Sequence, residues 1–242
     1  MDPEIKVLPD SAGIAVEAAE RVIAAANRAA GEGRSFSIAL AGGSTPKALY
    51  ELLASEAYKS RIDWPRVEVF FGDERTVPPD HKDSNYRMAN EALLSRVPIP
   101  GDNVYRMAGE VEPNEAAKEY GQMLKEKFGE GGMDLVLLGM GDDGHTASLF
   151  PATEALKETK HRCVANFVPK LSTWRLTLSV PFINRADNVM FLVSGASKAA
   201  RLQEVLEGPR DPTRLPSQLI QPASGRMTWL VDAPAAGMTG EE

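Results

Sequence analysis

The chain has 242 residues, of which 43% are hydrophobic and 25% are charged, and its net charge is -7. This is the composition of a globular protein with enough chain for one sizeable core. The acidic balance and the lack of a basic tract argue against a nucleic-acid or anionic-membrane surface. No apolar run approaches the roughly 20 residues of a membrane span.

The scarcity of cysteine and histidine restricts the chemistry further. Cys163 stands alone, which excludes an intrachain disulfide and a thiolate metal cluster, and we expect a half-buried apolar thiol. The three histidines, His81, His145 and His161, are too scattered for a zinc-binding spacing. The N-terminal MDPEIKVLPD has neither the basic start nor the apolar stretch of a signal peptide, so we expect a cytoplasmic protein.

Short apolar segments predict β-strands that are covered on both faces, because they are rich in Val, Ile, Leu and Phe and do not alternate strictly with polar residues. In chain order these segments are 36–42, 67–73, 134–140, 175–180, 189–195 and 227–232.

Between the predicted strands, apolar residues recur at the spacing of amphipathic helices. The helical stripes are Ala15/Ala19/Val22/Ala26, Leu49/Leu52/Leu53/Ala57, Ala117/Tyr120/Leu124/Phe128 and Ala199/Leu202/Leu206. The alternation of strand and helix predicts an α/β fold, with a largely parallel sheet covered by helices on both faces. No boundary divides the chain, so we expect a single domain over residues 1–242 with a frayed tail at 235–242.

Polar residues collect directly after four of the predicted strands. The segments are GGSTP at 42–46, GDER at 72–75, GDDGHT at 141–146 and SGASK at 194–198. In open α/β sheets, ligands bind at the carboxyl ends of the strands. If the strands are parallel, the four loops crowd one edge of the sheet, and their convergence predicts a ligand site there.

The GGSTP segment predicts the start of a helix and a site for an anion. Ser44 or Thr45 can cap the helix, and Pro46 suits its first position. Glycines, Gly43 among them, let the backbone approach a ligand, toward which free amides and the helix dipole would point. A capped helix start without a ligand explains the motif equally well, and the spacing of a Walker loop is absent.

Other charged residues of the loops have open alternatives. Lys198 can supply a positive charge to the same anion or be a solvated helix lysine. Arg175 begins a strand whose register is not fixed by the sequence, so it is either a second anion ligand or a surface residue. For Asp142 and Glu74 we expect solvent-facing or structural roles.

His145 follows a Gly-Asp-Asp-Gly turn at the predicted ligand edge, which favours catalysis over a structural role. Near neutral pH an imidazole can take a proton from water and return it to a leaving oxygen. Asp143 can orient or tune this imidazole. Asp73 and Arg75 can bind sugar hydroxyls or stabilise developing charge, and the sequence does not separate Asp73 from Asp143 in the mechanism.

The same segment contains G-x-G-x-x-G, formed by Gly139, Gly141 and Gly144, which is the pattern of dinucleotide-binding loops. That fingerprint needs a helix running on from the third glycine and an acidic residue after a second strand. Pro151 limits any such helix to about two turns, and Glu158 lies in a polar segment. The sequence therefore argues against NAD, and we expect these glycines to shape a tight turn.

Several longer segments resemble the 6-phosphogluconolactonase family. They are AGGSTPKALYELL (41–53), FFGDERTVPPDHKDSNYRMANEALL (70–94), DLVLLGMGDDGHTASLFP (134–151) and SGASKAARLQEVL (194–206), with RLTLSVPFIN (175–184) at a matching spacing. The match follows the family's order over nearly the whole chain, and the GDER-x-VPP-x4-SNY and DGHTASLFP blocks are its most specific parts. One departure is Ala152, where the family pattern leads us to expect glycine.

The resemblance implies hydrolysis of 6-phosphoglucono-1,5-lactone to 6-phosphogluconate, the second step of the oxidative pentose phosphate route, without a metal or organic cofactor. It implies that His145 acts on water with Asp143 in its loop. The implied substrate contacts are Gly43, Ser44, Thr45, Arg175 and Lys198 for the phosphate, and Asp73 and Arg75 for the sugar. The expected ligand is thus a small phosphorylated sugar lactone, and we expect a monomer or a small homo-oligomer.

Two other functions match part of the pattern. Glucosamine-6-phosphate deaminases are similar in the G-S-T-P and D-G-H loops, but they carry an acid where this chain has Ser148, Leu149 and Phe150. The GDER and SNY blocks also favour the lactonase. A sugar-phosphate sensor on this fold would carry a DNA-binding module, yet no helix-turn-helix region precedes the predicted strand near residue 36, and the net charge is negative.

Overall fold

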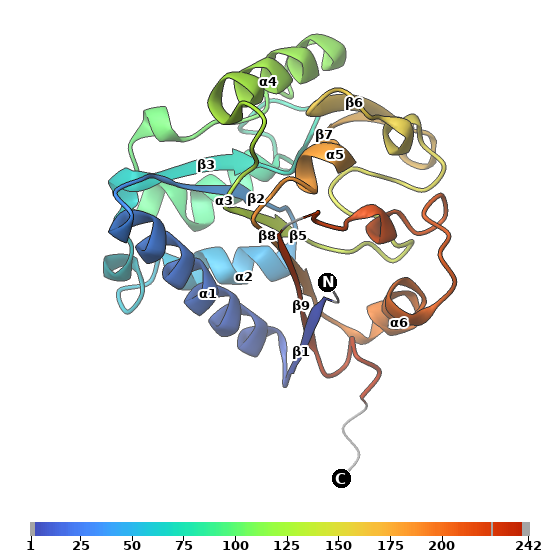
Figure 1. The fold of residues 1–242 in the computed structure, drawn as a ribbon, viewed down its shortest axis with the longest axis horizontal. Coiled ribbons are helices and arrows are strands. Elements are labelled where there is room, and N and C mark those ends of the chain that lie inside the picture. The colour runs from blue at the N-terminus through green and yellow to red at the C-terminus, as the bar shows by residue number, and fades with distance from the viewer. Residues whose placement is uncertain (1–2, 224, 239–242) are drawn as a thin grey trace.

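The computed structural model describes residues 3–223 and 225–238 and shows an α/β protein built around a six-stranded sheet (Figure 1). The strands of this sheet lie in the order β1-β9-β8-β5-β2-β3, and neighbours in this order are hydrogen-bonded to each other. All five pairings of this sheet are parallel. The strands are β1 (Glu4–Leu8), β2 (Phe36–Leu40), β3 (Val67–Phe71), β5 (Leu135–Leu138), β8 (Asn188–Val193) and β9 (Arg226–Asp232).

Helices cover both sides of the sheet. They are α1 (Ser11–Gly31), α2 (Ser44–Leu53), α3 (Asn85–Ala92), α4 (Pro113–Phe128), α5 (Val180–Ile183) and α6 (Ala199–Glu207). In Figure 1, α1 and α2 lie on one side of the sheet, and α4 and α5 lie on the other. The predicted α/β fold with a largely parallel sheet is therefore confirmed.

A second sheet with three antiparallel strands lies beside the carboxyl end of β3. Its order is β4-β7-β6, formed by β4 (Asp73–Arg75), β7 (Thr173–Leu178) and β6 (Cys163–Val168). The prediction that 175–180 belongs to the parallel sheet is wrong, because residues up to Leu178 form β7, which pairs antiparallel with β4 and β6. The predicted coverage on both faces holds at the end of this strand, where Leu176, Thr177 and Leu178 are all buried.

The two sheets meet at Gly72. Its N–H donates to the carbonyl of Leu40 at the end of β2, 2.9 Å away, and its carbonyl accepts from the N–H of Leu178 in β7 at 2.8 Å. β3 therefore turns directly into β4, which carries Asp73 and Arg75 over the edge where the parallel strands end.

The helices follow from the apolar stripes and from their caps. Asp10 accepts a hydrogen bond from the N–H of Gly13 and so caps α1, whose predicted stripe from Ala15 to Ala26 is buried. The predicted stripe of α2 extends too far, since the helix ends at Leu53 and Ala57 is exposed beyond it. The serine that follows the helix bonds back to the carbonyl of Leu52, which closes its last turn.

The first residues of the predicted frayed tail at 235–242 are packed against the protein and hydrogen-bonded. Ala235 is buried, and its N–H donates to the carboxylate of Asp232 at 2.8 Å. Backbone hydrogen bonds continue to Met238, and residues 239–242 lie outside the described part of the chain.

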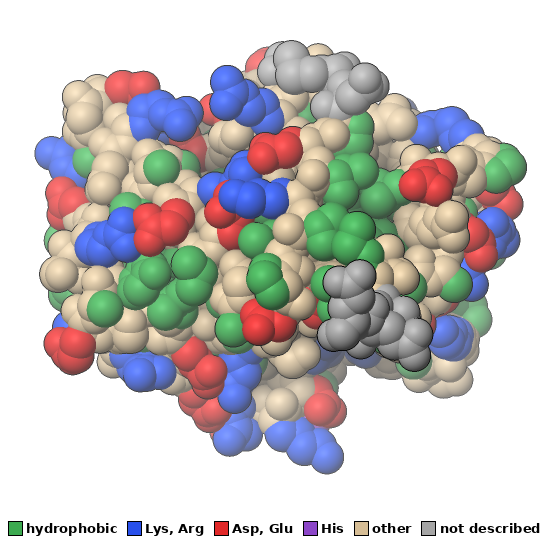
Figure 2. Space-filling model, turned by 90° about the horizontal axis from the view of Figure 1, so that it is seen from below, with side chains coloured by type: hydrophobic (Ala, Val, Ile, Leu, Met, Phe, Trp, Pro, Cys, Tyr) green, Lys and Arg blue, Asp and Glu red, His purple; other side chains and the backbone are tan. Residues whose placement is uncertain are grey.

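The described surface carries charges of both signs. On the face seen from below in Figure 2, basic and acidic side chains are interspersed among polar and apolar ones. Within the part of the chain that the structure describes, no helix combines the length and the apolar character needed to cross a membrane.

Candidate active site

A cavity of about 420 Å³ opens where the parallel strands end. All four predicted loops contribute to its wall: Gly43 after β2, Asp73 and Arg75 after β3, Gly141 and His145 after β5, and Lys198 after β8. The second sheet and its hairpin add Arg175 and Lys170. The parallel sheet thus brings together residues that lie up to about 155 positions apart in the chain, as expected for the carboxyl edge of such a sheet.

His145 and Asp143 form a close pair at this cavity. Nδ1 of His145 lies 2.5 Å from Oδ1 of Asp143, and the other carboxylate oxygen accepts from Nζ of Lys170 at 2.8 Å. The hydrogen bond with His145, assisted by Lys170 and opposed by partial burial, holds the pKa of Asp143 well below its usual range. An ionised Asp143 requires Nδ1 to carry the proton, so neutral His145 presents Nε2 as a proton acceptor.

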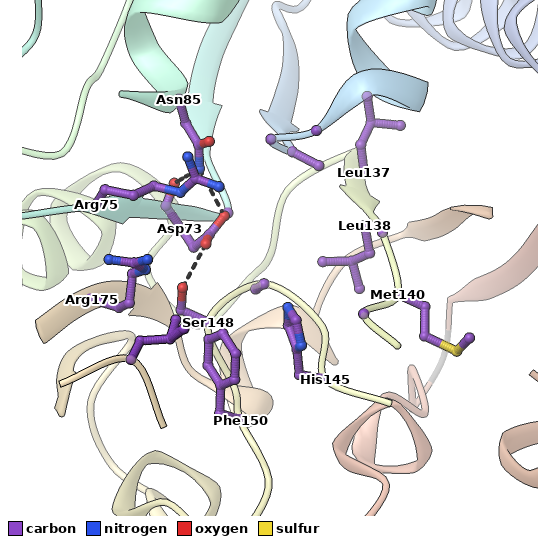
Figure 3. A pocket seen from close by; sticks show the side chains of 18 of the residues that line it. Asp73, Arg75, Asn85, Leu137, Leu138, Met140, His145, Ser148, Phe150 and Arg175 are labelled. Atoms are coloured by element: carbon purple, nitrogen blue, oxygen red, sulfur yellow. Dashed lines mark hydrogen bonds between the residues drawn. The ribbon is translucent and has the colours of Figure 1, made fainter. Parts of the chain in front are cut away.

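Asp73 occupies a different place, 8% exposed at the start of the second sheet. Its Oδ2 accepts from the hydroxyl of Ser148 at 2.6 Å, and its Oδ1 accepts from the side-chain amide of Asn85 at 3.1 Å (Figure 3). The structure therefore places Asp143, and not Asp73, on the imidazole. Asp73 is a fixed acceptor on the opposite wall from His145.

Glu74, the next residue, is buried and takes no part in the cavity wall. Its carboxylate accepts from the backbone N–H groups of Arg75, Asn85 and Tyr86 and from the hydroxyl of Ser84. These contacts tie the start of α3 to β4, and they position the Asn85 side chain that holds Asp73. Of the two roles expected for Glu74, solvent-facing or structural, this geometry supports the structural one.

Four cationic side chains line the cavity. Arg75 and Arg175 face each other across the β4–β7 pair, and burial together with the charge of Arg75 lowers the pKa of Arg175. Lys198 pairs with the exposed Asp142 at 2.6 Å, and Lys170 pairs with Asp143. Arg175 is thus a cavity residue, and Asp142 is exposed, which fits the solvent-facing one of the two roles expected for it.

The GGSTP segment starts α2 in a way that differs from the prediction. Gly43 is the N-cap, with φ of 105°, and no side chain caps the helix. Neither Ser44 nor Thr45 acts as the cap, because the helix already begins at Ser44, and Pro46 is its third residue rather than its first. Among the described residues, the backbone amides of Ser44 and Thr45 have no protein acceptor, and they follow Gly43, the one residue of these three that lines the cavity.

Sequence reasoning missed four polar or aromatic residues of the cavity: Asn85, Ser148, Phe150 and Lys170. Three of them, Asn85, Ser148 and Phe150, stood in the SNY and DGHTASLFP blocks without an assigned role. Ser84, which caps α3, was the available signal that the following Asn85 sits at a helix start. Lys170 had no signal, because its position depends on the turn between β6 and β7.

Within residues 3–223 and 225–238, no group of three or more His, Cys, Asp or Glu side chains is arranged to hold a metal ion. Cys163 is fully buried rather than half-buried, and burial raises the pKa of its thiol to about 12. The polar side chains that line the cavity are Asp73, Asn85, His145 and Ser148 together with the four cationic groups.

Comparison with known proteins agrees with this architecture. Residues 9–229 match the family model described as glucosamine-6-phosphate isomerases/6-phosphogluconolactonase. The chain belongs to this family. It is 41% identical to a 6-phosphogluconolactonase of Nostoc sp. over 241 residues, which cover 97% of this chain and 98% of the relative. The predicted family resemblance is therefore confirmed.

Solved structures of the family superpose closely. The 6-phosphogluconolactonase from Trypanosoma brucei matches with a TM-score of 0.85 and 32% identity, covering 98% of each chain. A monomeric glucosamine-6-phosphate deaminase matches with a TM-score of 0.82 over 98% of this chain, but at 19% identity this likeness shows the fold alone.

Proposed function

We propose that this protein hydrolyses 6-phosphoglucono-1,5-lactone to 6-phosphogluconate. The observation that carries the proposal is the pairing of His145 Nδ1 with Asp143, which leaves Nε2 as a proton acceptor beside four cationic side chains. A phosphorylated lactone needs both features: a base for water and positive charge for the phosphate. The 41% identity to a curated 6-phosphogluconolactonase over nearly the whole chain supports the same substrate.

The chemical step uses His145 twice. As the oxygen of water bonds to C1 of the lactone, Nε2 takes a proton from that water, and ionised Asp143 stabilises the imidazolium. The tetrahedral intermediate then expels the ring oxygen by breaking its bond to C1. The imidazolium returns its proton to this oxygen, which gives the hydroxyl of the open-chain product and restores neutral His145.

The remaining cavity residues divide between the two ends of the substrate. We assign the phosphate to the open amides at Ser44 and Thr45 beside Gly43, with Lys198 and Arg175 supplying positive charge from different sides of the cavity. Arg75 stabilises the negative charge that develops on the carbonyl oxygen. Asp73 keeps free acceptor capacity on its two fixed oxygens and binds a sugar hydroxyl.

A paired assay tests this function. Consumption of 6-phosphogluconolactone, with spontaneous hydrolysis subtracted, is measured beside deamination of glucosamine 6-phosphate. His145→Ala should lower kcat for the lactone about 10²- to 10⁴-fold. The matched control is His161→Ala, since His161 is exposed and pairs with Glu158 outside the cavity. Lactone hydrolysis at the background rate in the wild-type protein would refute the proposal, as would full activity of His145→Ala.

A further inference from the structure

The imidazole of His145 has few polar contacts to fix it. Asp143 binds Nδ1, but among the described residues Nε2 has no protein partner, and 27% of the side chain is exposed. A ring held by one hydrogen bond can still swing about that bond. Catalysis requires a defined position for Nε2, because displacement of a reacting group by about 1 Å can cost about 10²-fold in rate.

Phe150 supplies a second constraint. Its ring stacks on the imidazole with a centroid distance of 4.0 Å and an angle of 21° between the planes, and Figure 3 shows the two side chains next to each other. Phe150 is 8% exposed, so its ring is held by burial, and its backbone carbonyl accepts from the hydroxyl of Thr153 at 2.7 Å. The stack restricts the tilt of the imidazole plane.

Gly141 supplies a third constraint, because the imidazole fills the space of its absent side chain. A Cβ on Gly141 would lie 2.1 Å from both Cε1 and Nδ1 of His145. Backbone hydrogen bonds hold the two residues together, since the N–H of Gly141 donates to the carbonyl of His145 at 2.8 Å. Gly141 does not adopt a positive φ, so alanine can keep the backbone and the clash must move the ring.

The three glycines of the G-x-G-x-x-G pattern therefore have different requirements. At Gly139 an added Cβ meets no heavy atom within 4 Å. Gly144 has φ of 81°, a conformation that favours glycine, and a Cβ there would also meet Leu215, so glycine is required at this position by the backbone conformation and by packing. Of the three glycines, only Gly141 must lack a side chain to leave room for the imidazole of His145.

We propose that Gly141 and Phe150 are positioning residues that, together with Asp143, hold the imidazole of His145 in the orientation in which Nε2 meets the attacking water. This rests on the proposed function of His145 as the proton acceptor. Gly141 leaves the room for the ring, and Phe150 fixes its plane.

The position of the ring is measurable without substrate. In NMR spectra, the ring protons of His145 should lie upfield of those of His81 and His161 because of the ring current of Phe150; His145→Ala assigns them. Phe150→Leu should remove this upfield shift, and Gly141→Ala should change it. The matched control is Gly139→Ala, which adds the same methyl group two residues away and should leave the His145 signals in place. Unchanged signals in Gly141→Ala would overturn the proposal.

Kinetics then connect the ring position to catalysis. Gly141→Ala should lower kcat about 10²-fold with little change in KM, and Phe150→Leu should lower it about 2- to 10-fold, which is what an aromatic pair contributes. In a His145→Ala background neither change should lower the residual rate further, because no ring is left to position. Equal losses in both backgrounds would show a merely structural effect and overturn the proposal.

The two proposals fail in distinguishable ways. If His145→Ala abolishes lactone hydrolysis while Gly141→Ala keeps the wild-type kcat, the positioning role falls and the proposed function stands. If His145→Ala stays fully active, the proposed function falls, and the positioning of its ring loses its catalytic meaning with it.

Discussion

The carboxylate of Glu74 accepts four hydrogen bonds, three from the segment that carries the cavity residue Asn85 and one from Arg75, and an amide in its place cannot accept them all. Oε1 accepts from the N–H groups of Arg75 and Asn85, both at 2.7 Å. Oε2 accepts from the hydroxyl of Ser84 at 3.0 Å and from the N–H of Tyr86 at 2.8 Å. Glu74 is only 2% exposed, so water cannot replace a lost acceptor without a rearrangement.

Glu74→Gln keeps the shape of the side chain and turns one oxygen into an NH₂ donor. With NH₂ at the Oε1 position, the amides of both Arg75 and Asn85 lose their acceptor. With NH₂ at the Oε2 position, the Ser84 hydroxyl can rotate to accept, but the Tyr86 amide cannot. The second arrangement costs less and leaves one buried N–H unsatisfied, about 1–3 kcal/mol. For a chain of this length each kcal/mol lowers Tm by about 2–4 °C, so we expect a Tm about 2–12 °C below that of the wild type.

Thermal and urea unfolding measure this change. The matched control is Glu154→Gln, because Glu154 is highly exposed and pairs only with the exposed Lys157, a surface pair that contributes about 1 kcal/mol or less. Activity should fall with Glu74→Gln as well, since Asn85 holds Asp73. A Glu74→Gln protein with the Tm of the wild type or above would refute the reasoning, because the fold would then not need an acceptor for all four hydrogen bonds.

Three further predictions follow from charge and backbone geometry. Asp143→Asn should lower kcat, and it should also lower the free energy of unfolding at pH 7. Because the pKa of Asp143 is depressed in the folded protein, its ionised carboxylate stabilises the fold above the unfolded pKa of about 3.9. This stabilisation is lost as pH falls through the folded pKa. Equal stability loss at pH 7 and in strong acid would contradict this. Lys198→Ala should raise KM about 10- to 100-fold, and an unchanged KM would place Lys198 outside the phosphate site. Ala152 has φ of 56°, so Ala152→Gly should raise stability by up to about 1 kcal/mol; a lower Tm would count against strain at this position.

The cavity loops could be predicted because parallel strands end at one edge of a sheet. The apolar runs of β2, β3, β5 and β8 are visible in the sequence, and the polar residues directly after each run must therefore meet. The same logic needs no knowledge of side-chain conformation. It placed His145 and Lys198 at one cavity although β5 and β8 are about 50 residues apart.

The second sheet could not be predicted in this way. β4 has three residues, which is too short for a periodic signal, and β6 mixes polar and apolar residues. Because the second sheet was not predicted, Lys170, which lies in the turn between β6 and β7, had no expected place in the fold. The choice between Asp143 and Asp73 also needed the structure, because both follow strands of the parallel sheet and only the fold of each turn decides which carboxylate reaches the imidazole.

The edge strand β1 was missed for a related reason. Its sequence EIKVL is exposed along most of its length, so burial did not select apolar residues on both faces. β1 pairs with β9, and Glu4 lies opposite Thr228, so the pairing joins segments far apart in the chain, which a local pattern does not encode.

The junction at Gly72 has a mechanical consequence. Gly72 alone makes one hydrogen bond to the parallel sheet, at Leu40, and one to the second sheet, at Leu178. Sliding one sheet against the other would therefore break both hydrogen bonds. The wall that carries Asp73 and Arg75 is therefore fastened to the wall that carries Gly43, and the distance between them is set before any ligand arrives.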